Sequence, residues 1–97
     1  MDSDLENAAY IDSLGWVLFR KGDLKGARAE LEKAAKLPGG DDDPVVWDHL
    51  ADVLFRLGEK DKAIAAWQKA LALFDSRVRP KDERYKEIQQ KMKQTAP

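Results

Sequence analysis

The chain repeats itself at a spacing of 36 residues, and this repeat limits what the chain can fold into. Residues of the same kind return in the same register in both copies: Leu14 and Leu50, Gly15 and Ala51, Leu18 and Leu54, Gly22 and Gly58, Ala27 and Ala63, Leu31 and Trp67, Ala34 and Ala70. The repeat therefore predicts two copies of one structural unit.

Each copy has the apolar spacing of two helices separated by a glycine. In the first half of each copy, apolar residues recur three and four positions apart, which places them on one helix face: Ile11, Leu14 and Leu18, then Trp47, Leu50 and Leu54. Gly22 or Gly58 then interrupts the helix. In the second half, an alanine is followed four residues later by Leu31 or Trp67, which predicts a second helix that can approach the first closely.

These residues resemble the tetratricopeptide repeat, whose pattern is W-x2-L-G-x2-Y, then A-x3-F, then a proline. The first copy reads Ile11-x2-Leu14-Gly15-x2-Leu18 and Ala27-x3-Leu31, and the second reads Trp47-x2-Leu50-Ala51-x2-Leu54 and Ala63-x3-Trp67. Gly39 and Asp75 stand where the family has its closing proline. The period is slightly longer than the family's, which is about 34 residues, and the surplus falls in a loop at 38–44, where insertion costs little.

The resemblance implies an all-α fold, a right-handed stack of antiparallel helix pairs (an α-solenoid) with about five helices. We expect one repeat at 8–43, a second at 44–77, and a capping helix with a tail at 78–97. Asp43 is a suitable N-cap and Pro44 suits a first helical turn, so the third helix should begin there and end at Gly58. The resemblance also implies the C-terminal part of a longer bacterial-type protein of this family.

The last helix, expected at about residues 80–94, has one narrow apolar stripe formed by Tyr85, Ile88 and Met92. Charged residues occupy the rest of its surface: Lys81, Asp82, Glu83, Arg84, Lys86, Glu87, Lys91 and Lys93. A helix that is apolar on one side only is typical of the cap that closes a repeat stack and faces water outward.

The resemblance further implies a concave binding surface lined by the first helix of each pair. Mapped by position, the groove residues expected to bind a partner protein are Asp12, Trp16, Phe19 and Arg20 in the first copy, and Asp48, His49, Asp52, Phe55 and Arg56 in the second. We expect Trp16 to be an interaction hot spot and the three aspartates to attract a basic segment. The alternative is that the phenylalanines pack between helices and that the aspartates lie on a solvated face.

An acidic tail is not expected in this groove. Members of the family that bind the acidic C-terminal tails of chaperones use lysine and asparagine at the fifth and ninth positions of the first helix. This chain has Asp12 and Trp16 there in the first copy, and Asp48 and Asp52 in the second. These carboxylates would repel an anionic tail.

Two apolar residues of the first helix lack an evident cover. In the family, the third and tenth positions of a first helix pack against the preceding repeat, and these are Val46 and Val53 in the second copy and Tyr10 and Val17 in the first. Three interpretations remain open for Tyr10 and Val17: ordinary partial exposure, further repeats before residue 8, or an assembly face that forms a weak homodimer.

The charge balance and the lack of long apolar runs argue against two classes of partner. Seventeen basic and eighteen acidic residues leave a net charge of -1, so no positive field attracts nucleic acid or a membrane surface. The chain shows neither a signal peptide nor a membrane-spanning run, which is more typical of a cytoplasmic protein but leaves the compartment open.

Catalytic and metal-binding motifs are also missing. The chain has no cysteine, and the run of aspartates at 41–43 lacks the spacing of a calcium loop, so we expect no metal and no cofactor. Ser13 and His49 lie at equivalent positions on neighbouring helices, about 8–10 Å apart, too far for a catalytic triad. We therefore expect a non-catalytic module that binds a peptide or helix of a partner protein, with an assembly or dimerisation end of a larger repeat scaffold as the alternative.

Overall fold

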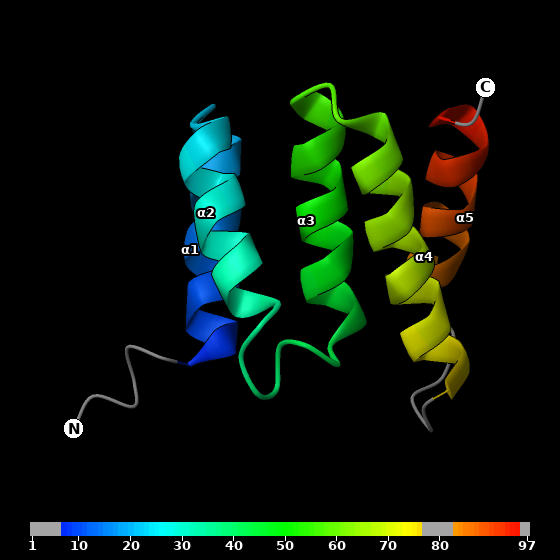
Figure 1. Ribbon diagram of the computed structural model, residues 1–97, viewed down its shortest axis with the longest axis horizontal. Coiled ribbons are helices and arrows are strands. Elements are labelled where there is room, and N and C mark those ends of the chain that lie inside the picture. Colours follow the sequence, from blue (N-terminus) through cyan, green and yellow to red (C-terminus); the bar gives the residue numbers. More distant parts are fainter. Residues whose placement is uncertain (1–6, 77–82, 96–97) are drawn as a thin grey trace.

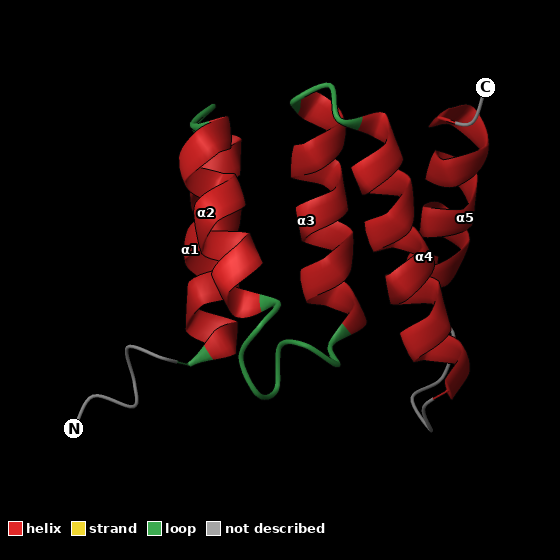
Figure 2. Ribbon diagram, in the orientation of Figure 1, coloured by secondary structure: helices red, strands yellow, loops and turns green. Residues whose placement is uncertain are grey.

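Five α-helices make up the computed structural model, which describes residues 7–76 and 83–95 (Figure 1, Figure 2). They are α1 (Ala8–Arg20), α2 (Leu24–Ala34), α3 (Pro44–Arg56), α4 (Lys60–Ser76) and α5 (Glu83–Thr95). No strand occurs within the described ranges, so the all-α prediction is confirmed. The predicted boundary between the second repeat and the cap falls at 77–78, outside the described residues.

The first three helices begin at polar caps. The side chains of Asn7 and Asp23 each accept a hydrogen bond from the backbone amide three residues further on, at 3.1 and 2.9 Å. Asp43 accepts from the amide of Val45 at 2.9 Å, and Pro44 occupies the first turn. The predicted start of the third helix is therefore confirmed, and its side-chain cap satisfies an amide that the helix itself leaves unpaired.

The same turn ends the first helix of each pair. Gly22 and Gly58 have φ angles of +92° and +86°, a left-handed conformation that residues with a side chain rarely adopt. The amide of the residue after each glycine donates to the carbonyl of Leu18 in the first copy and of Leu54 in the second, both at 2.9 Å. This hydrogen bond is typical of a glycine C-cap, and it reverses the chain into the next helix.

The helices pack as two pairs followed by α5. Helix α1 packs on α2 and α3 packs on α4, while α2 contacts α3 and α4 contacts α5 (Figure 1). The alanines that the repeat places at helix contacts are all fully buried: Ala27, Ala34, Ala63 and Ala70. None of these described helices has the length and apolar character that a bilayer-crossing segment requires.

Helix α5 covers the end of the stack as predicted. Ile88 is fully buried, and Tyr85 and Met92 pack partly against the core. The ring of Tyr85 meets the ring of Phe74 in α4 edge-on, with centroids 5.7 Å apart. The predicted apolar stripe is therefore the side of α5 that faces the second helix pair.

Equivalent residues of the two copies are not buried alike. Leu50 is 5% exposed, whereas Leu14, its equivalent in α1, is 38% exposed. Tyr10 and Val17 lie on either side of Leu14 along the helix and are 58% and 49% exposed. Leu14 and Leu50 share a repeat position but not an environment, because the described part of the chain leaves this side of α1 uncovered.

Candidate functional site

An aromatic cluster links α1 to α3 at the predicted groove. The indole of Trp16 lies between the ring of Phe19, with centroids 4.7 Å apart, and the imidazole of His49, with centroids 4.1 Å apart. Both pairs are stacked, with interplanar angles of 21° and 19°. Trp16 is still partly exposed. The stacking restricts the indole to one orientation, so little side-chain entropy remains to be lost if the indole is covered.

Asp12 and His49 join the first helices of the two repeats. Oδ1 of Asp12 lies 2.9 Å from Nδ1 of His49, and both side chains are mostly shielded from water. Ser13 is exposed, and the imidazole bonds to Asp12 instead. The arrangement is therefore an interhelical contact that also positions the Trp16 stack.

The exposed residues at the predicted groove positions are aromatic and cationic. The guanidinium carbon of Arg56 lies 5.5 Å from the ring centroid of Phe19, within reach of a cation–π interaction. Phe55 is 40% exposed, and its ring centroid lies 6.1 Å from that of Trp67 in the core. Arg20 is exposed at the end of α1. Phe55 thus packs partly between helices and partly faces solvent. The sequence had offered these two positions, packed or in the groove, as alternatives.

Asp48 is buried, although its position in the repeat places it in the groove. It is only 2% exposed. Its Oδ1 accepts hydrogen bonds from Nε1 of Trp67 at 3.1 Å and from Nζ of Lys91 at 2.8 Å, and its Oδ2 accepts one from Arg84 at 2.8 Å. A buried carboxylate is tolerated when donors surround it in this way. Asp48 therefore holds α5 on α3 and α4 and is not available to a partner while α5 is in place.

The repeat explains why α5 lies there. Asp12 and Asp48 are equivalent, and each binds a side chain about one repeat further along the chain, His49 in α3 or Arg84 in α5. Helix α5 thus occupies the place that the first helix of a third repeat would take. In Figure 1 α5 lies beside α4, which passes in front of its lower part.

Asp52 shares Lys91 with Asp48. Its Oδ1 accepts a hydrogen bond from Nζ of Lys91 at 2.9 Å. Burial, and then the negative charge of Asp48, raise the pKa of Asp52, and Lys91 offsets only part of this effect. The expectation that Asp12, Asp48 and Asp52 attract a basic segment needs correction, because all three carboxylates already have partners within the chain.

Arg84 and Lys91 are the residues that the sequence interpretation missed. Both belong to the side of α5 that was predicted to face water, but they turn toward Asp48. Long basic side chains can lie along an apolar surface and reach past the edge of a helix. The spacing of these residues could have predicted this position. Residues 84, 88 and 91 are four and three apart, which places both basic residues beside Ile88 on one helix face.

Lys91 makes the attachment of α5 dependent on pH. Burial alone would lower the pKa of Lys91, but the hydrogen bonds and charges of Asp48 and then Asp52 outweigh it and raise the pKa. A raised pKa in the folded state means that the stabilisation is complete below the unfolded pKa of about 10.4 and is lost as pH rises through the folded value. We therefore expect the thermal midpoint to fall more steeply above about pH 10 in the wild type than in Lys91→Gln.

Thermal unfolding followed by circular dichroism between about pH 8 and pH 12 checks this expectation. Lys93→Gln is the matched control, because Lys93 lies two residues away on the exposed side of α5. Equal slopes for the wild type and Lys91→Gln would show that the Lys91 interaction contributes nothing to the pH dependence.

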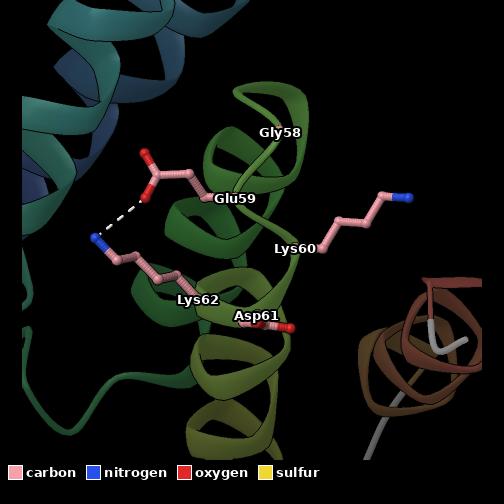
Figure 3. A pocket seen from close by; sticks show the side chains of 5 residues that line it. All are labelled: Gly58, Glu59, Lys60, Asp61 and Lys62. Carbon is pink, nitrogen blue, oxygen red and sulfur yellow. Dashed lines mark ion pairs between the residues drawn. The ribbon is translucent and has the colours of Figure 1, made fainter.

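A shallow hollow at the turn between α3 and α4 has a structural role. Gly58, Glu59, Lys60, Asp61 and Lys62 line it, and Figure 3 shows Lys60 pointing away from Glu59 and Lys62. Glu59 pairs with Lys62 at 3.1 Å and with Arg28 of α2. The hydrogen bond from Lys62, and then the one from Arg28, lower the pKa of Glu59. The pair between Arg28 and Glu59 ties the first repeat to the second.

Neither the hollow nor the described carboxylates have the features of a small-molecule or metal site. The lining of the hollow is charged and has no aromatic or apolar side chain to bury a ligand. Over residues 7–76 and 83–95, no three histidine or carboxylate side chains gather in a way that could hold a metal ion. Among the described residues, the predicted groove between α1 and α3 and the surface beneath α5 are candidate binding surfaces.

Comparison with protein families agrees with the repeat. Two family models described as tetratricopeptide repeat match the chain, one at residues 8–39 and the other at residues 44–76. These ranges contain α1 with α2 and α3 with α4. No curated protein matches the chain.

Proposed function

This chain belongs to the tetratricopeptide repeat family, and from that premise we propose that it is a non-catalytic module that binds a segment of a partner protein across α1 and α3. Repeats of this family generally mediate protein–protein interaction. The observation that carries the proposal is the Trp16 stack, an indole held between Phe19 and His49 but still partly exposed where the two repeats meet.

The partner segment needs an apolar or aromatic anchor. Such a side chain packs on Trp16 and Phe55, and tryptophan and arginine are the residue types most often found at interaction hot spots. Because Asp12 pairs with His49 inside the fold, the charge beside the stack comes from Arg56. Polar or acidic neighbours of the anchor therefore suit the groove better than basic ones, which reverses the preference expected from the sequence.

Trp16→Ala is expected to weaken binding of such a segment by about tenfold or more, because the indole supplies the buried contact area. The test is a two-dimensional NMR titration with pools of short peptides, each of which carries an aromatic residue in an acidic, neutral or basic context. We expect peptide-dependent shifts at Trp16, Phe19, His49 and Phe55.

Trp47→Ala is the matched control for that titration. Trp47 is also a partly exposed tryptophan, but its Nε1 donates to the carbonyl of Asp41 at 2.9 Å, outside the cluster. Equal loss of affinity in Trp16→Ala and Trp47→Ala, with both variants folded by circular dichroism, would contradict binding at the groove.

The second candidate function is an assembly end formed by Tyr10, Leu14 and Val17. The observation that favours it is the exposure of these three apolar side chains, whose equivalents Val46, Leu50 and Val53 are buried. The occupant that fits this face is the second helix of another helix pair, as α2 is to α3. In the same spectra, shifts confined to Tyr10, Leu14 and Val17 that grow with protein concentration instead of peptide concentration support assembly.

A further inference from the structure

Among the described helices, α5 has the fewest buried residues. Along Glu83–Thr95 it buries one residue fully, Ile88, whereas α3 buries seven and α4 buries five. Tyr85 and Met92 are only partly covered. Helices with little buried apolar area open at a lower free energy than the core around them, so α5 is the first described helix expected to detach.

The surface beneath α5 combines acidic and aromatic groups. Asp48 and Asp52 of α3 supply carboxylates, while Trp67 and Phe74 of α4 supply rings. Nζ of Lys91 also lies 5.6 Å from the ring centroid of Trp67, so one ammonium group contacts both kinds of side chain. The rings suit an amphipathic helix, which typically binds through apolar side chains at every third or fourth residue. The carboxylates suit basic side chains beside those anchors.

We propose that the surface of α3 and α4 beneath α5 is a binding site for a basic amphipathic helix of a partner protein, and that α5 occupies it in the free chain. The pattern that the site accepts is the one α5 shows: two basic residues seven apart, as Arg84 and Lys91 are, and apolar residues beside them at the positions of Tyr85, Ile88 and Met92. This site goes beyond the α1–α3 groove and involves different residues.

A partner helix fits this role better than α5 of a second copy. Exchange of α5 between two copies restores the same contacts and loses translational freedom, so exchange has nothing to drive it at low concentration. A partner helix can bind more tightly than α5, which buries little apolar area. Larger apolar residues at the positions of Tyr85 and Met92 would bury more of it. The partner helix must still compete with a tethered α5, whose effective concentration is on the order of 1 mM.

The test uses the full chain and a fluorescent synthetic peptide of residues 83–95. Ile88→Ala in the protein weakens α5 but leaves α3 and α4 intact, so the peptide is expected to bind this variant at least about tenfold more tightly than the wild type. A cap that does not detach from α3 and α4 predicts no such gain. Adding Asp48→Asn to Ile88→Ala is expected to abolish the gain, and so is a peptide with glutamine in place of Lys91.

The indole N–H resonance of Trp67 reports on the site directly, because it donates to Asp48. We expect it to shift on peptide binding while the indole resonance of Trp47 does not. If Ile88→Ala proves unfolded by circular dichroism, Lys91→Gln replaces it, since the Lys91 side chain is about a third exposed. Folded variants that bind the peptide no more tightly than the wild type, or that form dimers by exchanging α5, would overturn the proposal.

Discussion

Trp67→Ala is expected to lower the free energy of unfolding by about 3–5 kcal/mol. Trp67 is 1% exposed and is among the largest fully buried side chains. Its removal leaves a cavity between α3 and α4 and takes one hydrogen-bond donor from Asp48. For a domain of this size, the thermal midpoint should fall by roughly 15 °C or more, which scanning calorimetry measures.

Trp67→Phe separates the two contributions of this residue. Phenylalanine keeps most of the buried ring but cannot donate to Asp48, which retains Lys91 and Arg84 as partners. We expect a loss of about 1–2 kcal/mol, clearly smaller than for alanine. If both substitutions cost the same, the hydrogen bond would dominate and the cavity would not matter.

Leu50→Ala is expected to cost about 2–5 kcal/mol, while Leu14→Ala costs about 1 kcal/mol or less. The two leucines occupy the same position of the repeat and undergo the same chemical change. They differ in burial, because Leu50 is enclosed and Leu14 is 38% exposed. Urea unfolding of both variants measures the difference directly.

This pair also tests the uncovered side of α1. If Leu14→Ala costs as much as Leu50→Ala, then another element must cover Leu14 in solution, and the exposed face formed by Tyr10, Leu14 and Val17 would not exist. Repeating the measurement over a range of protein concentrations distinguishes cover by a second copy, because only then does the apparent stability depend on concentration.

Local chemistry explains why the helices could be predicted. Asp43 and Pro44 begin α3 and Gly58 ends it, and these residues act through the backbone of their own turn. The apolar spacing of α5 likewise predicted the face that buries Ile88. No distant part of the chain is needed for either prediction.

The groove was predicted less well than the helices. A position in the repeat predicts the direction of a side chain but does not identify the residue that it contacts. Asp12 and Asp48 point in equivalent directions, but Asp12 meets a histidine of α3, while Asp48 meets Arg84 and Lys91 of α5. The sequence interpretation treated both as free carboxylates, since nothing local to either aspartate identifies its partner.

The sequence by itself determined the repeat, the helix boundaries in the two pairs and the small residues at helix contacts, since spacing, caps and glycine turns act over a few residues. Only the tertiary structure decided which of two equivalent residues is buried. Leu14 and Leu50 differ because α1 and α3 have different neighbours. Burial and charge pairing depend on segments far apart in the chain, and Asp48 with Lys91 is the clearest case, since α5 converts an expected groove carboxylate into the buried attachment point of a helix.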